Sequence, residues 1–178
     1  MRSSSVTRPG RAIGVVLLAL GLAGCILSST KVLTHSLGDL SIEGANFFVP
    51  ATFVLSENAT WREHRNDIAR VDEVGVVTTV VNPTLVDASI TLLVSEDPDL
   101  RNLRDLRDRA FPLFPEVRVP AGGRRAISYD ESVDRLTSFD QVRTMVEDGT
   151  LTVYAVADGF FNLTLEDLTL VVTFTVER

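Results

Sequence analysis

Residues 168–176 read LTLVVTFTV and carry neither a charge nor a proline. Apolar residues occupy every second position from 168 to 176, and threonine fills most of the positions between them. A period of two is typical of a β-strand that buries one face, whereas a helix repeats about every 3.6 residues. An unpaired edge strand of this composition is prone to aggregation. We therefore expect this strand inside a sheet, with a neighbour on each side.

Seven further segments have the composition of short strands, and turn-forming residues separate them. The segments are 40–42, 47–55, 74–81, 88–94, 117–119, 124–129 and 151–157. The turn signals are Glu43-Gly44, Asn82-Pro83, Ala121-Gly122-Gly123 and Asp158-Gly159. About eight short strands at this spacing predict a mainly β protein, an antiparallel β-sandwich of about seven to eight strands. A closed barrel is the main alternative.

Two short helices interrupt the strands. Asp97 is a candidate N-cap for the first helix, Pro98 is suited to its first position, and Pro112 ends it. Its apolar side consists of Leu100, Leu103 and Leu106.

The second helix is expected to begin at Ser138, with Gln141 three residues later completing a capping box. Gly149 is its expected stop, because glycine readily adopts the left-handed conformation that ends helices. Its buried stripe is Phe139, Val142, Met145 and Val146. The helix leads directly into the strand at 151–157, so we expect it to close one end of the sandwich.

With 45% hydrophobic and 23% charged residues the composition is that of a globular protein, and the length of 178 residues allows one domain, or at most a domain with a small appendage. A single cysteine excludes an internal disulfide framework and a cysteine zinc cluster. The net charge of −7 argues against a nucleic-acid partner, since phosphate neutralisation needs clustered lysine and arginine.

The first 25 residues have the pattern of a secretory signal. Arg2, Arg8 and Arg11 precede an apolar run at 12–22, and small residues and Cys25 follow. The run has 11 residues, whereas a membrane-spanning helix needs about 20. A permanent span is therefore not expected.

The tetrapeptide Leu22-Ala23-Gly24-Cys25 resembles the lipobox of bacterial lipoproteins. The resemblance implies cleavage before Cys25, a diacylglycerol thioether on its sulfur and a further acyl chain, such as palmitate, on the new amino terminus. Two or more such chains anchor a protein stably. The expected organisation is a lipoprotein signal peptide at 1–24, the lipidated cysteine with a tether at 25–36, and a β-sandwich domain at 37–178. A secretory signal with a chance cysteine, or a structural thiol, is the alternative.

Cleavage changes the charge of the chain. The first 24 residues hold three of the 17 basic residues and none of the 24 acidic ones, which leaves 14 against 24 and a net charge of −10. Anionic headgroups repel such a body, so the membrane partner must be held through the lipid anchor. No aspartate follows Cys25 directly. By resemblance to the sorting rule of enteric bacteria, this favours the outer membrane if the host has one, and otherwise the outer face of the plasma membrane.

Three motifs occur in the order found in the LEA14-like family, whose unit is also called the water-stress and hypersensitive-response domain. They are Val80-Val81-Asn82-Pro83, Val119-Pro120-Ala121-Gly122-Gly123 and Met145-Val146-Glu147-Asp148-Gly149. The resemblance covers about residues 74–176 and implies a fibronectin/immunoglobulin-like sandwich with a protective or interaction role. It implies no catalytic residues, and the insertion at 96–116 is longer than the family pattern.

Residues suited to catalysis or metal binding are few. His35 and His64 are far apart in sequence, and the segment Trp61-Arg62-Glu63-His64-Arg65 is interpreted as a solvated loop or turn. No Gly-x-Ser-x-Gly elbow is present. The acidic groups Glu96, Asp97, Asp99 and Asp130, Glu131, Asp134 do not follow a calcium-loop pattern. Cys25, as the lipidation site, is the only site residue assigned, and no cofactor, metal or catalytic residue is expected.

Three functions remain open. The first is a membrane-anchored, non-catalytic envelope lipoprotein with a binding, protective or structural role, for which another envelope protein is a candidate partner. The second is a carrier of a small apolar ligand or lipid, held between the sheets or under the second helix. The third, an envelope hydrolase that uses His64 or an acidic pair, ranks last.

Overall fold

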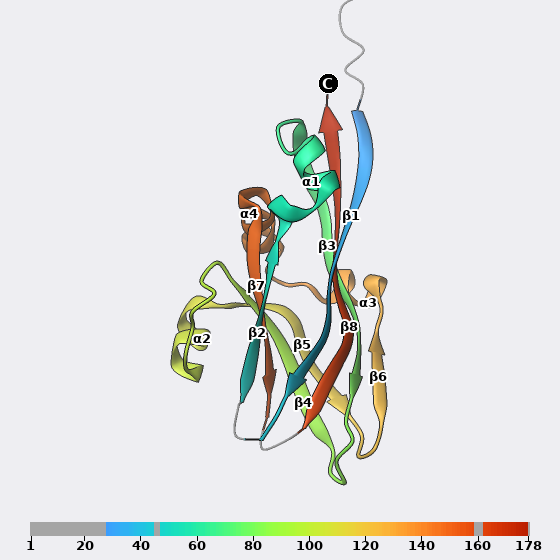
Figure 1. Ribbon diagram of the computed structural model, residues 1–178, viewed down its shortest axis with the longest axis vertical. Coiled ribbons are helices and arrows are strands. Elements are labelled where there is room, and N and C mark those ends of the chain that lie inside the picture. Colours follow the sequence, from blue (N-terminus) through green and yellow to red (C-terminus); the bar gives the residue numbers. More distant parts are fainter. Residues whose placement is uncertain (1–27, 45–46, 159–161, 178) are drawn as a thin grey trace, which may run out of the picture.

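The computed structural model describes residues 28–44, 47–158 and 162–177, and within them two four-stranded antiparallel sheets face each other (Figure 1). One sheet has the strand order β1-β8-β3-β6 and the other the order β2-β7-β4-β5. The strands are β1 (Ser28–Ile42), β2 (Phe48–Val54), β3 (Ile68–Val81), β4 (Ala88–Ser95), β5 (Phe111–Val119), β6 (Arg124–Ile127), β7 (Thr150–Ala157) and β8 (Leu163–Glu177). The predicted antiparallel sandwich is confirmed.

The strand pairs show how the chain is wound. β1 pairs with β8, β2 with β7, β3 with β6 and β4 with β5, all antiparallel. The first half of the chain thus pairs with the second half as one long antiparallel ribbon. The additional pairings of β3 with β8 and of β4 with β7 connect the strands of this folded ribbon into two sheets. Eight strands wound in this way make a jelly roll.

This topology differs from the fibronectin/immunoglobulin-like one that the LEA14-like resemblance implies. In an immunoglobulin sandwich the first strand lies beside the second, whereas here β1 lies beside β8 and β2 belongs to the other sheet. The expectation of an immunoglobulin-type strand order is therefore wrong. Local periodicity predicts strands but not which distant strands pair, and the β1–β8 pairing joins the two ends of the domain.

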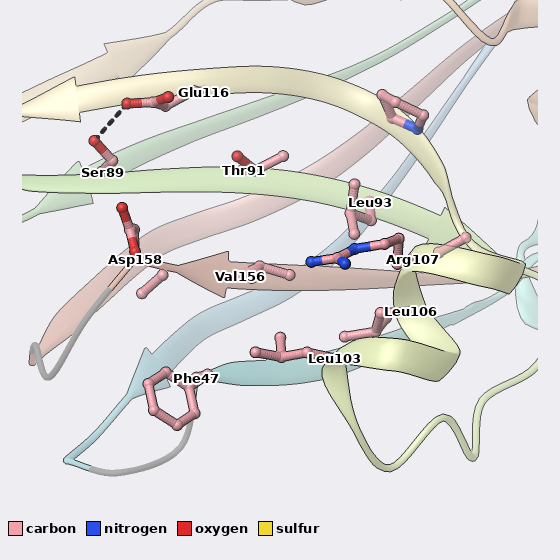
Figure 2. Close-up of a pocket in the computed structure, with 13 residues that line it drawn as sticks. Phe47, Ser89, Thr91, Leu93, Leu103, Leu106, Arg107, Glu116, Val156 and Asp158 are labelled. Carbon is pink, nitrogen blue, oxygen red and sulfur yellow. Dashed lines mark hydrogen bonds between the residues drawn. The ribbon is translucent and has the colours of Figure 1, made fainter.

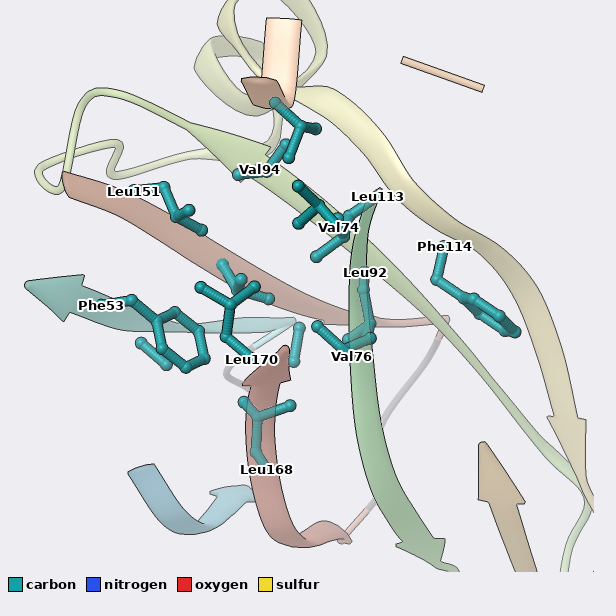
Figure 3. Packing of buried hydrophobic residues seen from close by; sticks show 14 of the residues in the cluster. Phe53, Val74, Val76, Leu92, Val94, Leu113, Phe114, Leu151, Leu168 and Leu170 are labelled. Atoms are coloured by element: carbon teal, nitrogen blue, oxygen red, sulfur yellow. The ribbon is translucent and has the colours of Figure 1, made fainter. Parts of the chain in front are cut away.

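The strand that decides the fold class lies inside its sheet, as predicted. β8 has β1 on one side and β3 on the other. Its alternating residues Leu168, Leu170, Val172 and Phe174 are fully buried between the sheets. Side chains from the facing sheet, including Phe53 and Leu92, meet them in one continuous core (Figure 3).

In the described ranges, four α-helices and one short 3-10 turn accompany the strands, two helices more than predicted. They are η1 (Leu55–Glu57), α1 (Ala59–His64), α2 (Leu103–Arg109), α3 (Tyr129–Arg135) and α4 (Phe139–Asp148). α4 is the predicted second helix: Val142, Met145 and Val146 are buried in the core, and Gly149 ends it at a φ of 85°. The predicted capping box is wrong, because the Ser138 side chain makes no capping hydrogen bond.

The helix α1 corrects the interpretation of residues 61–65 as a solvated loop. Trp61 and His64 are both buried, and they lie three residues apart on the same side of the helix. The side chain of Asn58 caps α1 by accepting hydrogen bonds from the amides of Thr60 and Trp61. The charged residues Arg62 and Glu63 lie between Trp61 and His64, and they obscure this buried side in the sequence.

The helix α3 lies against β3, where a glycine allows close approach. A Cβ atom on Gly75 would come within 2.9 Å of the Tyr129 ring. The hydroxyl of Ser132 accepts a hydrogen bond from the Val76 amide at 2.8 Å, beyond the end of the short pairing between β3 and β6. α3 therefore completes this edge of the sheet where β6 ends.

The domain boundary predicted at residue 37 is too late. Residues 28–36, expected in a tether, form the first part of β1, where Ser28 pairs with Glu177. Leu33, within this segment, is buried in the core, and Leu37, directly after it, packs against the core. The predicted signal peptide and Cys25 lie outside the described residues.

The two ends of the sandwich differ in what they carry. The start of β1, the end of β8 and α1 lie at one end, and the β3–β4 and β5–β6 turns lie at the other (Figure 1). β1 has 15 residues, and at about 3.3 Å per residue it is roughly 45 Å long. We call these the terminal end and the distal end.

Candidate functional site

The β2-β7-β4-β5 sheet has a second apolar surface on the side that faces away from the core. Inward and outward residues alternate along its strands, and the outward residues Phe48, Leu93, Tyr154 and Val156 are apolar or aromatic. An outer sheet face exposed to water would carry polar residues at these positions. We therefore expect another part of the chain to cover this apolar surface.

The insertion between β4 and β5, residues 96–110, lies over that outer face and includes α2 (Figure 1). Leu100, Leu106 and Tyr154 form a small buried cluster separate from the main core, with Phe48, Leu93, Ala110 and Val156 packed around it. Leu106 is 1% exposed and Tyr154 is fully buried. The insertion is therefore docked on the sheet through its own satellite core.

The hydroxyl of Tyr154 fastens the insertion to the sheet. It donates a hydrogen bond to the carbonyl of Asp97 at 2.6 Å and accepts one from the amide of Leu100 at 3.2 Å. Burial raises the pKa of Tyr154, and the nearby carboxylates of Asp97 and Asp99 raise it further. The neutral phenol is thus the form that holds the insertion.

The base of the insertion is closed by an ion pair and a hydroxyl. Arg109 pairs with Asp97 at 2.8 Å, and the hydroxyl of Ser95 donates to the carbonyl of Arg109 at 3.0 Å. Asp97 was expected to cap the first helix, and this is wrong. Its carboxylate accepts from the Asp99 amide in a turn, while Asn102 caps α2 by accepting from the Asp105 amide at 2.9 Å.

A groove of about 720 Å³ runs between α2 and the strands β4, β7 and β5 (Figure 2). Leu93, Val156 and Ala157 form its apolar floor, and Leu103 and Leu106 line it from the α2 side. Its volume lies within the range of about 300–1,000 Å³ that small-molecule sites occupy. The remaining lining residues are Phe47, Ser89, Thr91, Arg107, Ala110, Pro112, Glu116 and Asp158.

A second groove of about 720 Å³ lies along β2 on the other side of the insertion. It is lined by Phe47, Phe48, Val49, Pro50, Leu100, Arg101, Asn102 and Leu103. Phe47 and Leu103 line both grooves, and they are 37% and 44% exposed. The two grooves therefore share an apolar junction, and we refer to them together as the α2 groove.

Charged groups in the first groove lie at different places along it. The guanidinium of Arg107 extends from α2 over Val156, whereas Glu116 and Asp158 lie near Ser89 (Figure 2). Glu116 accepts a hydrogen bond from the Ser89 hydroxyl at 2.7 Å. Arg107 is the one basic residue among those that line the first groove. The groove thus has a cationic part over the apolar floor and an anionic end.

The two histidines, of which His64 belongs to the hydrolase alternative, lie in separate, aromatic surroundings. The ring of His35 packs edge-on against Phe53 at 5.8 Å, and His64 lies 6.4 Å from the Phe174 ring. The Nδ1 atom of His64 is buried and has no hydrogen-bond partner within the described part of the chain. The structure does not bring the two histidines together with the α2 groove.

Each acidic group weighed as a calcium site has one member in an ion pair. Asp97 pairs with Arg109, and Glu131 pairs with Arg125 at 2.7 Å. Across residues 28–44, 47–158 and 162–177, no group of three or more His, Cys, Asp or Glu residues is placed to hold a metal ion. None of the helices within these ranges is both long enough and apolar enough to cross a membrane.

Sequence reasoning missed Tyr154 and the groove, although a signal for them exists. In β7, which reads TLTVYAVA, the outward positions Tyr154 and Val156 are as apolar as the inward ones. A strand without polar alternation is covered on both faces. Combined with the leucines of the insertion, this pattern points to an element packed on the outside of the sheet.

Comparisons with known proteins add little to this geometry. No protein-family model and no curated protein matches the chain. A solved structure of Desmodium yellow mottle tymovirus is 8% identical, with a TM-score of 0.41, and the alignment covers 99% of this chain and 95% of that one. A structure of Mud crab tombus-like virus is 9% identical, with a TM-score of 0.44 and coverage of 100% and 94%. Likenesses at these scores carry no inference about function.

Proposed function

We propose that the protein is a non-catalytic lipoprotein of the cell envelope, anchored through lipid on Cys25, that binds an apolar ligand in the α2 groove. The observation that carries the binding role is the docked insertion, which leaves an apolar groove between α2 and the outer face of the sheet. The anchor rests on the lipobox Leu22-Ala23-Gly24-Cys25 and its preamble. The proposed location of the protein is the outer membrane if the host has one, and otherwise the outer face of the plasma membrane.

The position of β1 is consistent with such an anchor. Only Ile26 and Leu27 separate Cys25 from the first residue of β1. Three residue steps span at most about 11 Å, so a lipid on Cys25 would hold the terminal end close to the bilayer. The distal end would then point away from the membrane, roughly 45 Å further out along β1.

The groove favours a carrier or binding role over a structural one. Packing of Leu100 and Leu106 on Tyr154 accounts for the stability of the insertion. It does not account for Phe47 and Leu103, which remain 37% and 44% exposed where the grooves meet. The ligand alternative placed the apolar molecule between the sheets or under the second helix, whereas the groove lies outside the sheet and beside the first predicted helix.

The test of the anchor uses the full chain in a bacterial host. Cells are fed an alkyne fatty acid, and the protein is probed for label and fractionated between membrane and soluble pools. We expect the wild-type chain and a matched Ser29→Ala variant to be labelled and membrane-bound, and Cys25→Ala to be unlabelled and released. Label that persists in Cys25→Ala would contradict the anchor.

The non-catalytic role is tested separately. The purified protein is incubated with panels of ester, peptide, glycoside and phosphoester substrates. We expect no turnover above that of a heat-denatured sample. Robust turnover that is lost in His64→Ala would instead support the hydrolase alternative.

A further inference from the structure

We propose that the ligand of the α2 groove is a long-chain carboxylate, a fatty acid whose acyl chain lies on the apolar floor and whose carboxylate binds Arg107. This inference rests on the proposed binding role and adds the chemical class of the ligand. Three features carry it: the apolar path that the two grooves form, the cation Arg107 over the floor of the first groove, and the acidic groups at one end of that groove.

The apolar path continues from one groove into the other. The first groove runs along the sheet beside Leu93 and Val156, and the second continues along β2 past Pro50 and Leu100. The junction at Phe47 and Leu103 keeps the surface apolar between them. A flexible acyl chain can follow such a path, and each methylene that leaves water contributes about 0.8 kcal/mol, so a longer chain should bind more tightly.

Arg107 supplies a partner for an anionic headgroup. Its neighbour Arg109 is paired with Asp97 at 2.8 Å, whereas Arg107 has no hydrogen bond or ion pair within the described part of the chain. Its guanidinium extends over the floor of the groove (Figure 2). A guanidinium binds a carboxylate through two parallel hydrogen bonds, and the exposed side chain of Arg107 can offer them from the α2 side of the groove.

The acidic end fixes the direction of the ligand. Glu116 and Asp158 lie near Ser89, where a carboxylate headgroup would be repelled. Within the first groove the headgroup therefore belongs at Arg107, and the acyl chain extends toward the junction at Phe47 and Leu103. A neutral apolar molecule would gain nothing from Arg107, and a cationic one would be repelled by it.

The test is competitive photo-crosslinking on the full mature lipoprotein in nonionic detergent micelles. The probe is a diazirine analogue of palmitic acid, and the competitors are palmitic acid and its methyl ester, which has the same chain without the charge. Crosslinked peptides are mapped by mass spectrometry. We expect crosslinks on the insertion and on β7, and about tenfold weaker competition by the ester than by the acid.

Two variants on α2 complete the test. Arg107→Ala should weaken probe binding about tenfold and remove the difference between acid and ester. Arg104→Ala removes the same charge from an exposed position that lines neither groove, and it should behave as wild type. Equal competition by acid and ester on the wild-type protein would overturn the fatty-acid proposal, as would crosslinks confined to other surfaces.

These outcomes separate the two proposals. Crosslinks in the groove that do not depend on Arg107 would leave the groove as an apolar binding site and overturn only the carboxylate. The absence of any groove crosslink would overturn the binding role as well. The anchor at Cys25 is decided independently, by the mass of the amino-terminal peptide in the same digest.

Discussion

Leu92 and Leu93 are neighbours on β4 and point to opposite faces of the same sheet. Leu92 is 1% exposed and belongs to the core between the sheets, whereas Leu93 is half-buried and lines the α2 groove. Both faces of this sheet are apolar, but only the inner face meets another sheet. The outer face meets a short insertion that leaves part of it open. The comparison separates apolar surface that stabilises the fold from apolar surface left available to a ligand.

The largest expected effect is on the inner face. Leu92→Ala removes a fully packed side chain and leaves a cavity in the main core, so it should lower the free energy of unfolding by about 2–5 kcal/mol. Chemical denaturation followed by circular dichroism measures this value. Fatty-acid binding by the folded variant should stay near that of wild type.

Alanine substitution of the next residue, Leu93, should have the opposite effects, with a small loss of stability and a clear loss of binding. Leu93→Ala removes an outward side chain that is already in partial contact with water, and should cost only about 1 kcal/mol. It should weaken fatty-acid binding several-fold, because the floor of the groove loses contact area. If Leu93→Ala destabilised the fold as much as Leu92→Ala does, the distinction between the two faces would be lost.

The attachment of the insertion is tested by Tyr154→Phe. The ring remains, but the hydrogen bonds to Asp97 and Leu100 are lost, so the expected loss is about 1 kcal/mol. Hydrogen exchange should show faster exchange of the Leu100 amide and of α2, with little change in β8. Uniformly faster exchange throughout both sheets would show that the insertion is not a separate unit.

The pH dependence of stability follows from the same tyrosine. Burial raises the pKa of Tyr154 in the folded chain above its ordinary value of 10.0, and the pKa of Tyr129 is raised in the same way. Groups with a raised pKa stabilise the folded state fully below their unfolded pKa, and this contribution is lost as pH rises through the folded value. Stability should therefore fall above about pH 10, and less steeply in Tyr154→Phe. Chemical denaturation at a series of pH values measures both effects.

The smallest effect on stability is expected at Leu103. Its side chain is 44% exposed at the junction of the grooves, so Leu103→Ser should change stability by less than about 0.5 kcal/mol. Fatty-acid binding should nevertheless weaken, because the junction becomes polar. An unchanged affinity would limit the ligand to the part of the groove near Arg107.

Local patterns predicted the strands and missed what depends on distant partners. The alternation of residues 168–176 predicts an interior strand because burial on one face leaves a period of two. The pairing of β1 with β8 leaves no such trace, since residues more than 120 positions apart meet there. The helix cap at Asp97 failed for a similar reason: Arg109 and the Asp99 amide engage that carboxylate, and Asn102 offers an equivalent oxygen closer to the helix.

The α2 groove could be foreseen only in part. The leucines of the insertion and the doubly apolar strand β7 are visible in the sequence, but their docking depends on the hydroxyl of Tyr154, which contacts backbone atoms 54 and 57 residues away. The role of Arg107 depends on which arginine pairs with Asp97. Spacing along the sequence does not distinguish Arg107 from Arg109 as the partner of Asp97, so only the three-dimensional structure shows which of them is paired.

The most direct test of the central claim is the intact mass of the protein extracted from the membranes of its own cells and measured under native conditions. The account predicts a chain that begins at Cys25, carries acyl groups covalently on that residue, and retains a non-covalent fatty-acid mass that Arg107→Ala loses. A chain that keeps residues 1–24, or a free thiol at Cys25, would contradict the anchored lipoprotein proposed here.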